Sequence, residues 1–133
     1  PMTCFPFYKL NTPSLLHIGT AGGWTKPSTG FTFMNTRRKI DSLLSFLKTK
    51  KPLDAFSFKN RFLFYDLLFI DVLTKYNDQG SSLFARMFQK NHPVDVLRFI
   101  DEKSNFLKEL KIFISFSFKQ QVWFLDAIRR RIF

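Results

Sequence analysis

The fold of this chain depends on one glycine-rich stretch, Ile18-Gly19-Thr20-Ala21-Gly22-Gly23-Trp24-Thr25-Lys26-Pro27-Ser28-Thr29-Gly30, which holds four of its five glycines. The apolar residues 15–18 before it predict a short buried strand, and helical spacing begins after Gly30. A strand that breaks at glycines and continues as a helix can present backbone N–H groups to an anion. An ordinary glycine-rich turn has the same spacing, so the spacing alone leaves both interpretations open.

A helix is predicted over residues 30–48. Ser28 or Thr29 is expected to cap its N-terminus, and Pro52 prevents its continuation. The basic residues 37–39 are expected to form a solvated face, with an anion site as the alternative. The apolar residues of this helix recur at spacings of three, four and seven: Phe33, Ile40, Leu43, Leu44 and Leu47.

Beyond Pro52 the sequence predicts helices alone. Residues 59–76 form a long helix that is apolar on nearly every side, which is typical of a core helix or of one packed on a partner domain. Asp66 and Asp71 interrupt it, and their five-residue spacing puts them on different faces. Capping or ion-pair roles are therefore expected for both, rather than paired acid catalysis. Shorter helices follow, the last two over residues 105–115 and 119–132, and the predicted fold class is mainly α with a short β element.

The composition of the 133 residues restricts the class of partner. The formal net charge is +11, which favours nucleic acid, phosphates or an anionic membrane surface. The 19 Phe residues favour apolar packing between helices, or contact with lipid, over stacking on nucleic acid bases. Cys4 is the only cysteine, so no disulfide framework forms. No signal peptide or membrane-spanning segment is predicted. The chain begins at Pro1 with no initiator methionine, which predicts a fragment or a trimmed product.

The sequence offers few candidates for catalysis or metal binding. His17 and His92 stand alone and are expected to be structural, and no metal site is predicted. Ala21 and Trp24 occupy the places where a G-x-G-x-x-G turn needs glycine, and Lys26 is followed by proline rather than by Ser or Thr, so no Walker motif is present. We therefore expect no catalytic residue within this chain.

Residues 18–31 resemble the C-terminal flavin loop of the lycopene β-cyclase family. That family carries Gly-x-Ala-Gly-Gly and then Pro-Ser/Thr-Thr-Gly before an aromatic residue, and Gly19 to Gly23 and Pro27 to Phe31 match these patterns. Residues 1–7 resemble, more weakly, the segment that precedes this loop. Residues 64–68, 72–73 and 99–102 resemble the helical tail of the bacterial branch.

The resemblance implies an enzyme that binds FAD on a Rossmann-like domain and uses reduced nicotinamide cofactor (NADPH or NADH). A carboxylic acid protonates one end of lycopene, the carbocation closes a ring, and loss of a proton leaves a β-ionone ring. The family's dinucleotide turn and proton donor are expected upstream of Pro1. Residues 1–50 then form the C-terminal piece of the FAD-binding α/β domain, residues 51–133 form a helical tail, and this piece alone is expected to be inactive.

The resemblance also assigns cofactor-binding residues. The first group lines the pyrophosphate and ribityl region: Gly19, Thr20, Ala21, Gly22 and Gly23. The second group lies near the isoalloxazine ring: Pro27, Ser28, Thr29 and Gly30. The chain departs from the wider pattern twice. Thr20 replaces an Asp that holds a ribityl hydroxyl, and Lys26 replaces a His, so Lys26 is expected as a cation near the reduced flavin.

The expected partners are lycopene or a related linear carotenoid, the missing N-terminal part of the enzyme, and the membrane that dissolves the substrate. Because the tail is basic and rich in Phe, we expect a cytoplasmic protein held at the inner face of the cell membrane. The aromatic residues assigned to this contact, each with core packing as the alternative, are Phe113, Phe116, Phe118, Trp123 and Phe124. Two alternatives remain: another FAD-dependent reductase or monooxygenase, and a basic helical module that binds membrane or nucleic acid, although no nucleic acid partner is expected.

Overall fold

The computed structural model describes residues 7–57 and 61–132. Cys4, the weaker resemblance over residues 1–6 and the predicted start of a helix at residue 59 lie outside these ranges. The chain divides into two compact units, Pro1–Asp66 and Leu67–Phe133, and the division falls inside one helix. Each unit is described below by itself. The division predicted from the sequence, with a piece of the FAD-binding domain over residues 1–50 and a helical tail over residues 51–133, remains a prediction.

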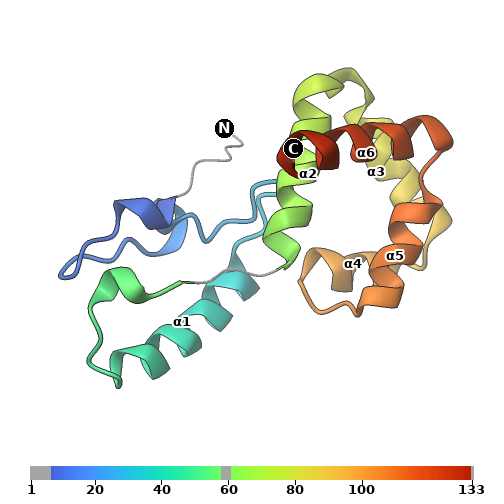
Figure 1. Ribbon diagram of the computed structural model, residues 1–133. Helices are drawn as coiled ribbons and strands as arrows, with labels where there is room; N and C mark the ends of the chain where they lie inside the picture. Colours follow the sequence, from blue (N-terminus) through green and yellow to red (C-terminus); the bar gives the residue numbers. More distant parts are fainter. Residues whose placement is uncertain (1–6, 58–60, 133) are drawn as a thin grey trace. The chain divides into compact units, whose positions relative to one another are not determined.

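The first unit contains one full α-helix and several short turns of 3₁₀ helix (Figure 1). These are η1 (Phe7–Leu10), η2 (Gly19–Gly22), α1 (Phe33–Leu47) and η3 (Leu53–Ala55), followed by the first residues of α2 (Arg61–Lys75). The helix predicted over residues 30–48 is therefore confirmed, with a later start at Phe33 and an end one residue earlier at Leu47. Its predicted cap is wrong, because Thr32 precedes the helix and makes no side-chain cap bond.

The predicted buried strand over residues 15–18 is wrong. Among the described residues the β structure is limited to one bridge between Thr12 and Leu15, and the side chains of Leu15 and Ile18 are half exposed. The bridge is a tight local turn, in which the Leu15 N–H also donates to Thr12 Oγ1 at 3.1 Å. A strand needs a partner to satisfy its backbone groups, and here Asn11 Oδ1 accepts the His17 N–H instead, at 3.0 Å.

The second unit is a bundle of helices, as the sequence predicts. After the remainder of α2 come η4 (Asn77–Gln79), α3 (Gly80–Lys90), α4 (Pro93–Ile100), α5 (Phe106–Ser115) and α6 (Phe118–Ile132). Local signals set two of the helix starts. Pro93 occupies the first turn of α4, and the Asn105 side chain accepts the Lys108 N–H at 3.0 Å to cap α5.

Arg131 and Asp71 join α6 to α2 within the second unit. The Arg131 guanidinium donates to both carboxylate oxygens of Asp71, at 2.5 and 2.8 Å, and to the Leu67 carbonyl at 3.3 Å. This bidentate geometry is the strong form of an Arg–carboxylate pair. The ion-pair role predicted for Asp71 is thus confirmed.

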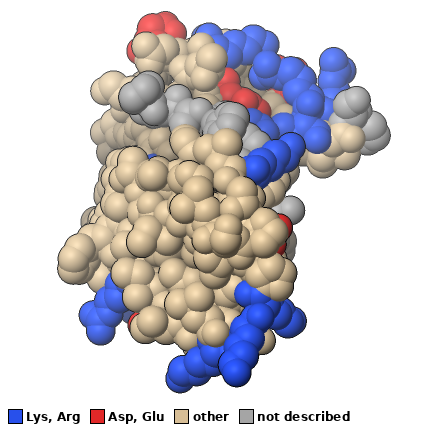
Figure 2. All heavy atoms as spheres, turned by 90° about the vertical axis from the view of Figure 1, so that its left-hand side faces the viewer, with Lys and Arg blue, Asp and Glu red and all other residues tan. Residues whose placement is uncertain are grey.

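Basic side chains cover the surface unevenly. Figure 2 shows a face that is largely uncharged, on which Lys and Arg stand in separate groups. No helix within residues 7–57 and 61–132 combines the length and the apolar composition needed to cross a membrane.

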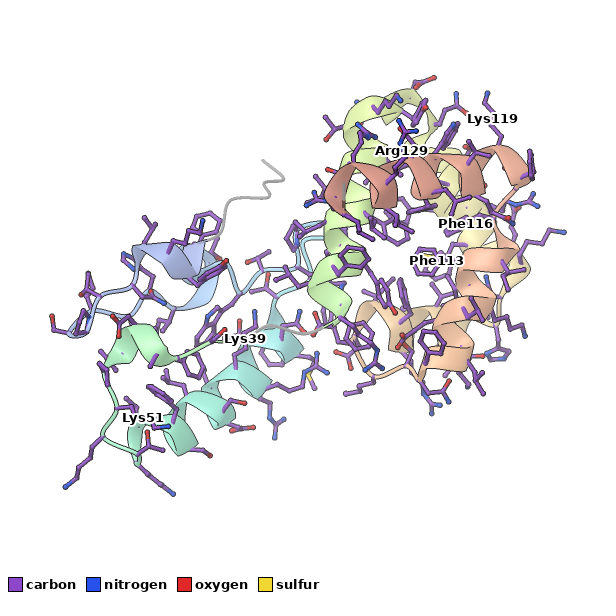
Figure 3. All side chains as sticks on the ribbon, in the orientation of Figure 1. Lys39, Lys51, Phe113, Phe116, Lys119 and Arg129 are labelled. Carbon is purple, nitrogen blue, oxygen red and sulfur yellow. The ribbon has the colours of Figure 1, made fainter. Side chains whose placement is uncertain are left out.

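Aromatic side chains form the core of the second unit. The Phe69 ring lies 5.0 to 6.2 Å from the rings of five other phenylalanines, which come from α3, α4, α6 and the α5 region: Phe84, Phe99, Phe113, Phe116 and Phe124. Figure 3 shows Phe113 and Phe116 directed between the helices, and Lys119 and Arg129 directed outward.

This core corrects the membrane contact predicted for the tail. Phe116, Trp123 and Phe124 are buried, and Phe113 is partly buried within the same aromatic cluster. Only Phe118 among the five assigned aromatics is exposed, at 82%. Composition cannot separate these cases, because a buried and an exposed Phe look alike in a sequence.

Two exposed ion pairs in the second unit should make its stability depend on pH. Lys108 lies 2.5 Å from Asp95, and Lys75 lies 3.1 Å from Asp126. Their hydrogen bonds lower the pKa of Asp95 and of Asp126 below 3.8, and the bond to Asp126 raises the pKa of Lys75 above 10.5. A lowered carboxyl pKa gives stability that is present above the unfolded value and is lost as the pH falls through the folded value.

We therefore expect the unfolding temperature of the second unit to decrease as the pH falls below about 4. It should decrease again as the pH rises above 10.5, the pKa of Lys in the unfolded chain. Thermal unfolding between pH 2.5 and pH 11 measures both the acid and the alkaline decrease. Asp126→Asn removes the pair with Lys75, so it should make both decreases smaller. A variant whose profile matches the wild type would contradict this assignment.

Candidate functional site

The glycine-rich stretch folds as a 3₁₀ turn followed by a closed loop. Its first part is η2, where the N–H groups of Gly22, Gly23 and Trp24 donate to carbonyls at 2.8 to 3.1 Å within residues 18–20. These three donors are used internally. In the described part of the chain no acceptor contacts the N–H groups of Gly19, Thr20 and Ala21.

The glycines of this stretch are required for two different reasons. A Cβ at Gly22 would lie 2.2 Å from the His17 carbonyl oxygen, and one at Gly23 would lie 2.8 Å from the Phe7 ring, so the protein itself fills these places. Gly19 and Gly30 have positive φ, +59° and +71°, and no atom of the described residues lies within 4 Å of where their Cβ would be. Only these two leave open space beside a backbone conformation that favours glycine.

The second part is a loop over residues 26–31, closed by its own backbone. The Lys26 N–H donates to the Phe31 carbonyl at 2.9 Å, and the Gly30 N–H donates to the Lys26 carbonyl at 2.8 Å. Threonine hydroxyls connect this loop to η2. Thr32 Oγ1 lies 3.2 Å from Thr25 Oγ1 and 3.0 Å from the Gly30 carbonyl, and Thr25 Oγ1 lies 3.2 Å from Thr20 Oγ1.

The inner side of the loop is held by a buried carboxylate from α2. Lys26 Nζ donates to Asp66 Oδ2 at 2.9 Å, and Ser28 Oγ donates to Asp66 Oδ1. All three residues are nearly inaccessible, with 4%, 5% and 3% of their surface exposed for Lys26, Ser28 and Asp66. A buried ion pair with both carboxylate oxygens engaged restrains the loop strongly, since opening the loop would separate two opposite charges in a buried environment. We call these three residues the loop clamp.

The sequence-assigned cofactor residues therefore separate into three groups. Gly19, Thr20, Ala21, Thr29 and Gly30 lie at accessible or open positions, Gly22 and Gly23 pack against neighbouring protein, and Lys26 and Ser28 belong to the loop clamp. Pro27 lies between the two clamp residues and is partly buried. The binding of FAD by these residues remains a prediction.

Asp66 is the site residue that sequence reasoning did not connect to the loop. Its ion-pair role is predicted and confirmed, but its partner is 40 residues away. The available signal was a lone carboxylate in an apolar helix together with a lysine between glycines. Pairing them requires knowledge of which face of α2 meets the loop, and that face is set by tertiary packing.

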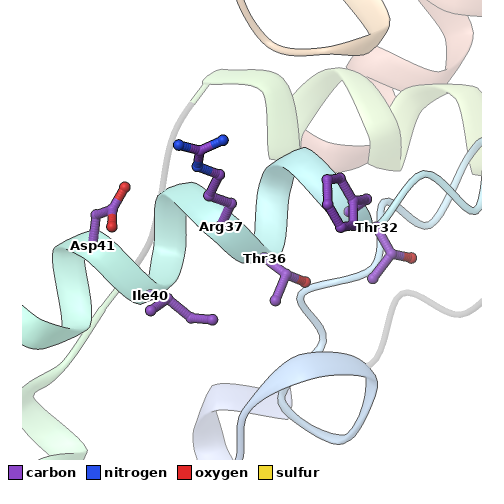
Figure 4. Close-up of a pocket in the computed structure, with 6 residues that line it drawn as sticks. Thr32, Thr36, Arg37, Ile40 and Asp41 are labelled. Atoms are coloured by element: carbon purple, nitrogen blue, oxygen red, sulfur yellow. The ribbon is translucent and has the colours of Figure 1, made fainter.

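A shallow groove of about 480 Å³ runs along α1, beginning two residues after Gly30. Figure 4 shows Thr36 and Ile40 on one side of the helix and Arg37 and Asp41 on the other. Its residues are Thr32, Phe33, Thr36, Arg37, Ile40 and Asp41. Thr36 Oγ1 is buried and has no hydrogen-bond partner among the described residues, and Phe33 is 77% exposed.

The two histidines have structural contacts, as predicted. His17 lies against Asn11, with Nδ1 3.4 Å from Asn11 Oδ1, and His92 Nδ1 accepts the Val94 N–H at 3.3 Å at the start of α4. Across the described ranges no group of three His, Cys, Asp or Glu side chains could hold a metal ion.

Comparison with family models identifies the class of protein as an enzyme of carotenoid cyclisation. The model described as lycopene cyclase protein matches residues 1–123, which include the glycine-rich stretch, the loop clamp and most of the helical tail. The chain therefore belongs to the lycopene cyclase family. No curated protein and no solved structure matches the chain. Family membership supports a cyclase-like function and a carotenoid substrate.

Proposed function

We propose that this chain contributes part of the FAD site of a lycopene β-cyclase, which closes the ends of lycopene into β-ionone rings. The observation that carries the proposal is the open space beside Gly19 and Gly30 within the loop of a lycopene cyclase family member. A backbone with positive φ and no neighbouring atom lets a large planar ligand approach closely. The open glycines would therefore allow a flat cofactor such as FAD to approach the backbone.

The accessible residues of the stretch would hold the cofactor. Gly19, Thr20 and Ala21 would lie against the pyrophosphate and ribityl part, and Thr29 and Gly30 against the isoalloxazine ring. Bound reduced flavin would supply negative charge that stabilises a cationic transition state in a site from which water is excluded. Lys26 and Ser28 would act through the loop's shape, because their side-chain atoms are committed to Asp66. Asp66, paired with Lys26, is not proposed as the proton donor.

The reaction is tested with the complete coding sequence that contains residues 1–133, expressed in bacteria that accumulate lycopene. Cyclisation rearranges bonds and conserves mass, so the product should have the mass of lycopene, a shorter-wavelength absorption spectrum and a new chromatographic position. A gain of two hydrogens would instead identify a reductase, and a gain of one oxygen a monooxygenase. Unchanged lycopene beside soluble, FAD-loaded protein would contradict the proposal.

A substitution at Gly30 tests the flavin contact. Valine there would fill the open space and strain a backbone with φ of +71°, so Gly30→Val should weaken FAD binding by about tenfold or more. Flavin fluorescence quenching measures the affinity. Gly80→Ala is the control, because Gly80 has a helical φ of −58° at the start of α3. Equal affinities for the two variants would argue against a ligand at Gly30.

Contact with the cytoplasmic face of the membrane is proposed for the exposed apolar residues of the tail, in place of the buried aromatics. Along α5 these are Leu107, Leu110 and Ile114, and along α6 they are Phe118, Val122 and Leu125. Each set of three recurs at helical spacing along its own amphipathic helix. Lys119 and Arg129 are directed outward (Figure 3). Such faces lie in the interface of anionic bilayers, where each basic residue contributes about 1 kcal/mol.

The double variant Phe118→Asp/Leu125→Asp should reduce binding to anionic vesicles by about tenfold or more, because both residues are exposed on α6 and would place carboxylates against lipid. Vesicle flotation with phosphatidylserine-containing and neutral vesicles measures the effect. Phe33→Asp, at an exposed position of α1, is the matched control and should bind as the wild type does. Wild-type protein that fails to float with anionic vesicles would refute the contact.

A further inference from the structure

Asp66 contacts both sides of the loop turn with one carboxylate. Its Oδ2 accepts from Lys26 Nζ at 2.9 Å, and its Oδ1 accepts from Ser28 Oγ. These two residues flank Pro27, whose ring fixes its own φ. A single side chain from α2 therefore restrains three successive residues of the loop.

The loop tip is free of this restraint and faces open space. Thr29 and Gly30 are exposed, whereas Lys26 and Ser28 are buried. Two backbone hydrogen bonds close the loop, and each such bond contributes only about 1 kcal/mol net. Exposed loops held so weakly open readily. The clamp supplies the missing restraint, because opening the loop would separate a buried ion pair.

We propose that Asp66 is a positioning residue, which fixes the conformation of residues 27–30 so that the exposed Thr29–Gly30 tip is already in its ligand-binding shape. Lys26 thereby serves the loop through Asp66 and makes no direct contact with the ligand. This inference rests on the proposed function only for the identity of the ligand. Pre-organisation of this kind increases affinity because less conformational freedom is lost on binding.

The test compares two aspartates of the same helix. Asp66→Asn keeps the shape of the side chain and removes the charge that faces Lys26. Asp71→Asn is the matched control, since Asp71 is also on α2 and ion-paired, but with Arg131. Both are made in the complete coding sequence that contains residues 1–133, and three quantities are measured: amide hydrogen exchange over residues 26–31, FAD affinity by flavin fluorescence, and the unfolding midpoint.

For Asp66→Asn we expect the Gly30 amide to exchange about tenfold faster and FAD to bind about tenfold more weakly, with neither change in Asp71→Asn. Lys26→Met/Asp66→Leu separates positioning from stability. Because Met and Leu replace the buried ion pair with apolar side chains, the unfolding midpoint should return to the wild-type value. Amide hydrogen exchange over the loop should stay fast, because Ser28 still lacks its acceptor. If Asp66→Asn does not fold, Ser28→Ala gives the same exchange and affinity readouts without leaving a charge buried.

Three results would overturn the inference: unchanged loop exchange in Asp66→Asn and in Ser28→Ala, equal effects from Asp66→Asn and Asp71→Asn, or slow loop exchange in the double variant. Wild-type protein that binds no FAD would reject the proposed function, while the exchange measurement would still decide whether Asp66 positions the loop.

Discussion

Phe69→Ala is expected to lower the free energy of unfolding of the second unit by about 3–5 kcal/mol, the usual cost of removing a buried aromatic ring. Phe69 is buried, and its ring lies within 6.2 Å of five other rings. Truncation removes the centre of this cluster and leaves a cavity that rigid helices cannot fill.

The two tryptophans allow the units to be followed separately, because Trp24 belongs to the first unit and Trp123 to the second. Phe69→Ala is made in a Trp24→Phe background, and denaturant unfolding is followed through Trp123 fluorescence. Phe118→Ala is the control at an exposed position on α6, and it should change stability by no more than about 0.5 kcal/mol. A loss below about 1 kcal/mol for Phe69→Ala would contradict the assigned core.

Asp66→Ala should lower the stability of the first unit by about 3–5 kcal/mol, because it removes the carboxylate that pairs with the buried ammonium of Lys26 at 2.9 Å. Ser28 also loses its acceptor. The variant is made in a Trp123→Phe background, where the buried indole of Trp24 reports on the unit that contains the loop.

Asp71→Ala in the same background is the control. The Asp71 side chain is about a quarter exposed and its Arg131 partner lies in the second unit, so the Trp24 signal should not change. If Asp66→Ala lowers the free energy of unfolding by no more than about 1 kcal/mol, the loop clamp contributes as little to stability as an exposed ion pair does.

Most helices of this chain were predictable from local signals. The helices predicted over residues 105–115 and 119–132 appear as α5 (Phe106–Ser115) and α6 (Phe118–Ile132), because apolar periodicity and N-capping residues act within a few positions. Pro93 set the start of α4 in the same way. The predicted strand failed because a strand is not a local structure. Residues 15–18 needed a second strand, which the described residues do not contain.

The glycine-rich loop was predictable from the sequence, but its side-chain contacts were not. The sequence indicated that residues 19–30 form a loop able to approach a ligand, and it indicated a paired role for Asp66. It assigned Lys26 to the cofactor, whereas the side chain is buried against Asp66. The difference arises because a lysine among glycines looks exposed in a sequence, and only packing reveals a carboxylate 40 residues away.

Sequence alone was enough for the properties that depend on residue type and spacing: the helical class, the basic charge and the family of the glycine-rich stretch. Tertiary structure decided every property that depends on which surfaces meet. It put Phe113, Phe116 and Phe124 into the core while leaving Phe118 exposed, and it joined Asp66 to Lys26 and Ser28. Burial and ion pairing are relations between distant residues, and short-range periodicity carries no information about them.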